Sequence, residues 1–208
     1  MARTLKHYPS VSLKLEDSDG KIDFVRIFGR AGPVHIEIGT GKAAFLLNQA
    51  KAQPEVNFLG VERANKYYRF GVDRIGRWGL TNVRIIRADA AAFLADFAPA
   101  GCVDCCHIYF PDPWPKRRHH KRRFFTAARL EQVIRMLKTG GIIKVATDDA
   151  EYFDLIKQLF EGEKARLQPT EFLPAAGADV GEWVGTNFER KYLKQNRPIY
   201  TIAVRKTR

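Results

Sequence analysis

Short apolar runs alternate with helical stretches from residue 34 onward, and this alternation constrains the fold more than any other feature of the sequence. Each of the first five runs is nearly continuously apolar and is followed by a stretch with helical spacing. The pattern is typical of a parallel sheet that is covered by helices on both faces and joined by right-handed crossovers. We expect strands at residues 34–39, 57–62, 83–89, 102–110 and 142–147, and two further strands near 166–173 and at 199–205.

The expected architecture is a single α/β domain at residues 21–208, with a mostly parallel seven-stranded sheet, preceded by a mobile basic arm at residues 1–20. A chain of 208 residues is long enough for one such domain, and no break in composition indicates a second one. The arm carries scattered charges and no sustained periodicity, which indicates loose attachment. Helices are expected at residues 42–52, 64–78, 90–97, 124–137 and 151–160, the fourth of them stopped by Gly140 and Gly141.

The charge balance favours a polyanionic partner. The 35 Lys and Arg residues outnumber the 23 Asp and Glu residues, which gives a net charge of +12 and a pI near 9.8. We therefore expect nucleic acid as the first candidate partner and an anionic membrane surface as the second. No apolar run approaches the roughly 18 residues of a membrane span, and the N-terminus lacks the core of a signal peptide. No obligatory protein partner is evident, and a monomer or a homodimer is expected.

The three cysteines, Cys102, Cys105 and Cys106, lie together in an apolar segment. The first two have CxxC spacing, but no second pair and no nearby His-x3-His motif completes a zinc site. We therefore expect buried thiols in a reducing cytoplasm, and no metal.

Acidic residues stand at or just after the ends of five predicted strands. The carboxyl ends of parallel strands meet at one edge of the sheet, where such folds bind ligands, so these side chains are expected to converge on one crevice. A convergence of five carboxylates is hard to explain as surface decoration. The residues are Glu37, Glu62, Asp89, Asp112 and Asp148.

The sequence EIGTGKAAF at residues 37–45 predicts a cofactor-binding turn after the first strand. Gly39 and Gly41 permit a tight turn and a close backbone approach at a helix N-terminus. Glu62 stands at the end of the second strand, where a carboxylate binds ribose hydroxyls. A nicotinamide dinucleotide stays open on this pattern, because alanine is tolerated at the third glycine position, here Ala44.

The position of Glu37 favours a different cofactor. Two residues before the first glycine of the loop, its carboxylate would repel a pyrophosphate but suit a cationic ligand such as S-adenosylmethionine. Asp89, after the third strand, can accept a hydrogen bond from an adenine amino group. A local capping or ion-pair role for Glu37 is the alternative.

Residues 110–123 read FPDPWPKRRHHKRR and combine a rigid half with a basic half. Alternate prolines fix the backbone and are expected to hold Asp112, Trp114 and Lys116 extended on one face. The stretch is either a catalytic segment at the edge of the site that binds a polyanion, or a proline-rich turn followed by solvated charges. Trp114 either stacks on a base or packs structurally.

Six blocks stand in order along the chain: EIGTGKAAF (37–45), GVE (60–62), RAD (87–89), FPDPWPKRRHHKRR (110–123), ATDD (146–149) and TNFERK (186–191). Together they resemble the signature motifs of bacterial tRNA (guanine-N(7)-)-methyltransferases, in that family's order and spacing, over roughly residues 28–205. The FPDPWPK block with its basic run is highly specific. One departure is Ala43, which stands where the family usually has the last glycine of GxGxGxF.

The resemblance implies a Rossmann-like class I methyltransferase fold that uses S-adenosylmethionine to methylate N7 of the guanine at position 46 in the tRNA variable loop. Such a protein is an RNA-binding enzyme of tRNA modification and processing. The matching motifs assign cofactor binding to Glu37, Glu62, Asp89 and Asp112, with Asp112 also catalytic. They assign substrate binding to Lys116, Asp148, Thr186, Asn187, Phe188 and Glu189, and RNA contact to Arg118, His119, His120, Lys121, Arg122 and Arg123.

This chemistry suits the residues. N7 of guanine carries a free lone pair, so no general base is required, and a carboxylate such as Asp112 can align the acceptor and stabilise its developing charge. The stacked target base must be extracted, and Asp148 or Glu189 could accept hydrogen bonds from its Watson–Crick edge. Two alternatives stay open: a non-catalytic RNA-binding protein on the same fold, and a nicotinamide-dependent oxidoreductase, which a missing Tyr-x3-Lys pair disfavours.

Overall fold

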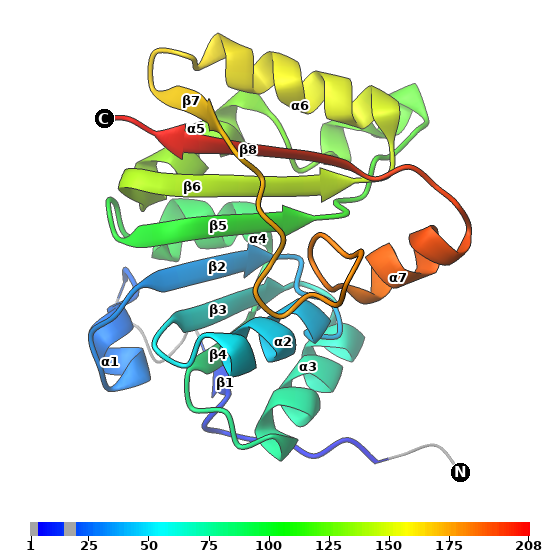
Figure 1. Cartoon of the computed structure of the whole chain (residues 1–208). Helices are drawn as coiled ribbons and strands as arrows, with labels where there is room; N and C mark the ends of the chain where they lie inside the picture. Colours follow the sequence, from blue (N-terminus) through cyan, green and yellow to red (C-terminus); the bar gives the residue numbers. More distant parts are fainter. Residues whose placement is uncertain (1–3, 15–19) are drawn as a thin grey trace.

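An eight-stranded sheet forms the centre of the computed structural model, which describes residues 4–14 and 20–208 (Figure 1). The strand order is β1-β4-β3-β2-β5-β6-β8-β7. The first six strands in this order are parallel, and β8 lies antiparallel between β6 and β7. The strands are β1 (Ser12–Leu13), β2 (Val34–Ile38), β3 (Asn57–Glu62), β4 (Val83–Arg87), β5 (Val103–Tyr109), β6 (Leu137–Thr147), β7 (Leu167–Thr170) and β8 (Tyr200–Lys206).

Helices cover both faces of the sheet, as the alternating pattern predicts. In Figure 1, α2 and α3 lie in front of the sheet and α5 lies behind it. A π-helical turn at Phe93–Phe97 extends α4, and a 3-10 helix occupies Arg117–Arg122. The helices are α1 (Phe24–Phe28), α2 (Ala44–Ala52), α3 (Asn65–Arg77), α4 (Ala90–Ala92), α5 (Ala127–Met136), α6 (Ala150–Gly162) and α7 (Asn187–Lys194).

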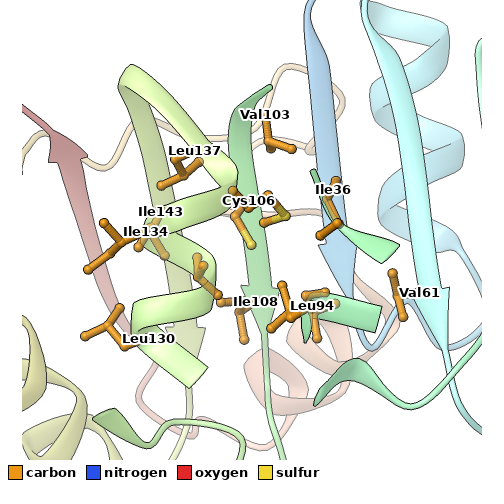
Figure 2. Close-up of a cluster of buried hydrophobic side chains, with 14 of the residues drawn as sticks. Ile36, Val61, Leu94, Val103, Cys106, Ile108, Leu130, Ile134, Leu137 and Ile143 are labelled. Carbon is orange, nitrogen blue, oxygen red and sulfur yellow. The ribbon is translucent and has the colours of Figure 1, made fainter. Parts of the chain in front are cut away.

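The central strands are buried on both faces, which explains why their sequences are nearly continuous apolar runs. On one face of β5, Cys106 and Ile108 pack into the cluster of Figure 2, together with Leu94 and Leu130 from the covering helices. On the opposite face, Tyr109 belongs to a second cluster that includes residues of α2 and α3. The two clusters fix the sheet between its helical layers and so fix the positions of its strand ends.

The expected helix at 124–137 and its glycine stop require a correction. Helix α5 ends at Met136, and Leu137 already has extended geometry and begins β6. Gly140 and Gly141 lie inside β6 rather than ending the helix. Gly140 has φ 84°, a left-handed conformation that favours glycine, and a Cβ atom on Gly141 would stand 3.0 Å from the carbonyl oxygen of Val103.

The sheet has one strand more than the seven expected, because part of the predicted N-terminal arm joins it. The two residues of β1 pair with β4, and Val11 just before them is buried. Tyr8 packs directly against Gly76 of α3. The predicted arm also includes residues 1–3 and 15–19, which lie outside the described residues, and its mobility stays a prediction.

The periodicity of the sequence does not predict α7. This short helix is rich in charge, and its apolar residues form no long run. Among the helices of the described residues, none combines the length and the apolar character that a membrane crossing requires.

Candidate functional site

A cavity of about 650 Å³ opens at the carboxyl edge of the sheet. The strand order reverses between β2 and β5, and this edge is where ligands bind in open α/β sheets. Three of the five predicted carboxylates line the cavity, which confirms part of the expected convergence. The walls are formed by Ile38, Gly39, Val61, Glu62, Arg63, Ala88, Asp89, Ala90, Ala91, Ile108, Tyr109, Pro111, Asp112, Trp114, Arg122, Phe124 and Arg129.

The glycine loop connects β2 to α2 through three residues in the left-handed region. Gly39 has φ 78° and Gly41 has φ 55°, conformations that favour glycine. Ala43 has φ 54° and caps α2 without a side-chain hydrogen bond. The alanine that departs from the family pattern therefore occupies a position where glycine would be less strained.

Glu62 is fixed at the floor of the cavity by two backbone donors. Its Oε2 accepts a hydrogen bond from the Gly41 N–H at 2.8 Å, and its Oε1 accepts one from the Ala64 N–H at 2.7 Å. Each carboxylate oxygen has a second lone pair. The side chain therefore ties the glycine loop to the end of β3 and can still accept hydrogen bonds from a ligand.

Glu37 lies under the same loop but does not line the cavity. It is buried, and its carboxylate accepts a hydrogen bond from the Thr40 hydroxyl. Burial raises the pKa of Glu37 to about 8, an effect that the nearby Glu62 increases and the Thr40 hydrogen bond opposes. Glu37 is therefore mainly protonated at neutral pH.

Asp89 and Asp112 line the cavity in different ways. The Oδ1 of Asp89 caps α4 by accepting from the N–H groups of Ala91 and Ala92, and its Oδ2 lies 3.8 Å from Arg63. The carboxylate of Asp112 has no hydrogen-bond or ion-pair partner within residues 4–14 and 20–208. It is thus the cavity carboxylate that is free to meet a charged reactant.

The expectation of an extended segment from Asp112 to Lys116 is wrong at Trp114. Trp114 has φ 46°, a left-handed conformation that is uncommon for a large side chain, and Phe110 just before the segment has φ 50°. The prolines fix their own backbone but do not hold Trp114 extended. Asp112 and Trp114 nevertheless both reach the cavity wall.

The basic run divides into an exposed set and one buried residue. His119 packs edge-on against Trp114, and the Arg122 guanidinium lies 4.9 Å from the centre of the same ring. His120 lies 4.0 Å from Glu151. Five cations are exposed and have no ion pair in the described part of the chain: Lys116, Arg117, Arg118, Lys121 and Arg122.

Arg123 is 3% exposed, although it belongs to the predicted RNA-contacting segment. Its Nε donates to the carbonyl oxygen of Pro113 at 2.7 Å, and its guanidinium pairs with Glu151 at 2.8 Å. It also lies over the ring of Tyr152. The structure therefore gives Arg123 contacts within the protein, where it links the proline segment to α6.

The predicted TNFE motif forms the beginning of α7. Thr186 is the N-cap and accepts a hydrogen bond from the Glu189 N–H at 3.0 Å. The Glu189 carboxylate is fully buried and accepts three hydrogen bonds, from the N–H groups of Trp183, Val184 and Gly185. Asn187 and Phe188 are exposed. This geometry makes Thr186 and Glu189 capping residues that hold the preceding loop.

Asp148 follows β6, the neighbour of β5 in the sheet, and does not line the cavity. Its side chain is 10% exposed and forms an ion pair with Arg197. The sequence motifs predict no role for Arg197 or for Arg129, which lines the cavity. Neither residue belongs to a motif that could have identified it.

His107 is buried on the α2 face of β5. Its Nδ1 lies 2.7 Å from the Tyr109 hydroxyl, and its Nε2 lies 3.2 Å from Nδ1 of His35. Cys105 completes a group of three side chains whose potential ligand atoms lie within 4.8 Å of one another. Burial lowers the pKa of both histidines and raises that of the Cys105 thiol. All three cysteines are free, and Cys102 is half-buried rather than buried.

Comparisons with known proteins agree with this geometry. Residues 31–202 match the family described as "Putative methyltransferase". A tRNA (guanine-N(7)-)-methyltransferase of Alkalilimnicola ehrlichii is 34% identical over 206 residues, which cover 96% of this chain and 83% of the relative. One of Streptococcus thermophilus is 31% identical over 196 residues, which cover 94% and 90%.

Solved structures show the same fold at low sequence identity. A 30S ribosomal A1408 methyltransferase from an uncultured bacterium aligns with a TM-score of 0.60 at 19% identity, over 92% of this chain and 97% of that one. A SAM-dependent methyltransferase from Aquifex aeolicus aligns with a TM-score of 0.57 at 13% identity, over 86% of each chain. The predicted fold class is thereby confirmed.

Proposed function

Since the chain belongs to the tRNA (guanine-N(7)-)-methyltransferase family, we propose that it transfers a methyl group from S-adenosylmethionine to N7 of a tRNA guanine. The observation that carries this proposal is the convergence of the glycine loop, Glu62, Asp89 and Asp112 on one cavity beside the exposed basic helix. We place the acceptor at position 46 of the variable loop, as the resemblance of the motif blocks implies.

The residues of the cavity fit an adenosyl ligand. Glu62 is held by two backbone N–H groups and keeps lone pairs for ribose hydroxyls. Asp89 stands at the next strand end, where its Oδ2 can accept from an adenine amino group. Ile38, Val61 and Ile108 supply apolar surface for the base, and a volume of about 650 Å³ is sufficient for a ligand of this size.

Glu37 lies under the glycine loop and can become negatively charged when a cationic ligand binds. Because burial keeps it mainly protonated at neutral pH, it costs the empty site little electrostatic energy. A cationic group arriving at the glycine loop favours the carboxylate and lowers the pKa of Glu37 again. We therefore assign it an indirect role in cofactor binding, through Thr40 and the loop.

Asp112 is assigned the catalytic role. When bound, S-adenosylmethionine supplies an electrophilic methyl group on a sulfonium centre. N7 has a lone pair available, so the site needs alignment and charge stabilisation rather than a base. The unpartnered carboxylate of Asp112 on the cavity wall can provide both, because positive charge moves onto the guanine as the methyl group is transferred.

We assign binding of the tRNA phosphate backbone to the five exposed cations at residues 116–122. Phosphate contacts of this kind supply affinity and register but little sequence information. They lie beside the cavity, since Trp114 and Arg122 form part of its wall. We further propose that the protein is cytoplasmic, that its reaction uses no metal and that it is a monomer or a homodimer.

The proposal is tested by incubating the protein with labelled S-adenosylmethionine and an unmodified tRNA transcript, and mapping the label by cleavage at 7-methylguanine. We expect label at the variable-loop guanine, and Asp112→Asn should lower kcat by about 10²-fold to 10³-fold, the range for a lost electrostatic group. Asp96→Asn, at an exposed position outside the cavity, is the control. Binding of tRNA without transfer would favour the non-catalytic alternative.

A further inference from the structure

Three side chains with metal-binding atoms meet on the face of the sheet that α2 covers. His35 lies on β2, and Cys105 and His107 lie on the neighbouring strand β5, where Cys105 pairs directly with His35. One potential ligand atom from each residue lies within 4.8 Å of the other two. The group is therefore held by the two central strands at which the strand order reverses, and none of its three residues lines the proposed cofactor cavity.

The distances within this group are close to those that one bound metal requires. Nδ1 of His35 lies 3.2 Å from Nε2 of His107, and the sulfur of Cys105 lies 4.0 Å from Nδ1 of the same His107 ring. Metal–nitrogen bonds of about 2.0 Å and metal–sulfur bonds of about 2.3 Å place two ligand atoms of one metal about 3.3–3.7 Å apart. The three ligand atoms therefore need to close by only about 1 Å to hold an ion.

Both imidazoles are neutral and can each offer a lone pair to a metal. Burial lowers the pKa of His35 to about 4 and that of His107 well below its ordinary value, so each ring keeps one unprotonated nitrogen at neutral pH. When the lone pair of His107 is on Nε2, its Nδ1–H donates to the Tyr109 hydroxyl, 2.7 Å away. In metal sites, a hydrogen bond of this kind from the second ring nitrogen fixes the tautomer and the orientation of the ring.

Burial and charge together indicate which metal the group would bind. Cys105 and His107 are each 5% exposed, and an unbalanced charge in such surroundings is costly. Two neutral imidazoles and one thiolate balance a single positive charge, whereas a divalent ion leaves one charge unbalanced. Thiolate ligands favour Cu(I) and Zn²⁺, and of these two ions only Cu(I) leaves the filled site neutral. His35 is partly exposed, so an ion can enter from the surface.

We propose that His35, Cys105 and His107 form a binding site for Cu(I). A copper–sulfur bond forms as the S–H bond of Cys105 breaks, and one proton is released to solvent for each ion bound. Copper remains Cu(I) throughout, so binding needs no oxidant and no reductant. The bound ion would link β2 to β5 inside the protein. The site is separate from the proposed methyl transfer, which uses no metal, and the inference does not rest on that function.

The other two cysteines provide the competing explanation for bound copper and the matched controls. Cys102 has CxxC spacing with Cys105 and a free thiol, but its sulfur lies 3.3 Å from the carbonyl oxygen of Pro99. Cys106 points to the opposite face of the sheet, into the apolar cluster of Figure 2. Cys102→Ser and Cys106→Ala should therefore bind Cu(I) as the wild type does, whereas Cys105→Ser should not.

Anaerobic titration of the full chain with Cu(I) held by the coloured chelator bicinchoninate tests the site. The wild type should remove one Cu(I) per chain from the chelator. Cys105→Ser and His35→Ala should each weaken binding by at least about 100-fold, and Zn²⁺ should bind the wild type at least about tenfold more weakly than Cu(I). A folded wild type that removes no copper, or binding that is lost in Cys102→Ser but kept in Cys105→Ser, would overturn the proposal. Tighter binding of Zn²⁺ than of Cu(I) would also overturn it.

X-ray absorption of the copper-loaded wild type identifies the ligands without any substitution, so its result does not depend on how the variants fold. We expect one sulfur at about 2.3 Å and two imidazole nitrogens at about 2.0 Å from the copper. Two sulfur ligands would assign the ion to Cys102 and Cys105 and disprove the site. Failure of the copper site would leave the proposed function intact, because methyl transfer is assayed without copper. A chain that binds copper as described but transfers no methyl group would instead remove only the proposed function.

Discussion

The Nε of Arg123 donates a hydrogen bond to the carbonyl oxygen of Pro113, one residue after the proposed catalytic Asp112. The same guanidinium pairs with Glu151 on α6. The guanidinium of Arg129 donates hydrogen bonds to the carbonyl oxygens of Arg123 and Phe124. The backbone next to Asp112 is therefore held by the buried Arg123, whose own backbone is held by Arg129. Within one basic run, this separates a positioning residue from the exposed cations that we propose to bind RNA.

Arg123→Ala should destabilise the protein, whereas the neighbouring Arg122→Ala should not. Removing the buried guanidinium leaves the Pro113 carbonyl without its donor, at a cost of about 1–3 kcal/mol in the free energy of unfolding. Denaturant unfolding of both variants measures the difference. Arg123→Lys should recover only part of the stability, because one ammonium cannot reproduce the planar fork. Equal stability of the two alanine variants would show that Arg123 is not held as described.

The exposed cations should determine the salt dependence of tRNA binding. Replacing Arg118 and Lys121 together by alanine removes up to two phosphate contacts, and each lost contact lowers the slope of log K against log salt by about 0.7–0.9. Binding measured from 50 to 200 mM salt gives the slope. Lys164→Ala, at an exposed position paired with Glu161 on α6, should leave the slope unchanged. A slope that is equal in the double variant and the wild type would show that these two side chains face solvent and contact no phosphate.

Many residues of the site can be predicted from the positions of the strand ends. The others depend on tertiary packing, which no pattern in the sequence indicates. Glu62, Asp89 and Asp112 reach one cavity because apolar runs mark the strands and parallel strands share a carboxyl edge. Arg122 and Arg123 are indistinguishable in a basic run, and only the tertiary contacts with Pro113 and Glu151 bury the second.

Backbone conformations around the site were the least predictable part. Proline fixes its own φ but only biases its neighbour, so the left-handed Phe110 and Trp114 could not be anticipated. The two residues of β1 are too few to show a periodicity. Helix α7 depends on the Thr186 cap and the buried Glu189 rather than on an apolar stripe, and the motif containing them suggested substrate contact instead.

Glu37 should make stability decrease as the pH rises. Its pKa of about 8 in the folded protein exceeds the ordinary 4.5 of an unfolded chain, so between these values the folded state holds a proton that the unfolded state has lost. The stabilisation is complete below about pH 4.5 and falls by about 1.4 kcal/mol per pH unit until about pH 8. The side chain of Glu37→Gln cannot ionise, so the free energy of unfolding of this variant should lack the pH-dependent part that Glu37 contributes. Parallel unfolding curves at pH 6, 7 and 8 test the difference, and an unchanged pH dependence in the variant would rule out a protonated Glu37.

Glu189→Gln separates a structural role from the substrate contact that the motif implies. A glutamine has one acceptor oxygen in place of two and no charge, so at least one of the three N–H groups at Trp183, Val184 and Gly185 loses its partner. We expect a loss of about 1–3 kcal/mol in stability and faster amide hydrogen exchange at those three residues. Glu171→Gln, at an exposed position before the loop, is the matched control. If the variant instead kept its stability and exchange rates but bound tRNA more weakly, Glu189 would be a substrate contact that becomes exposed when the tRNA binds.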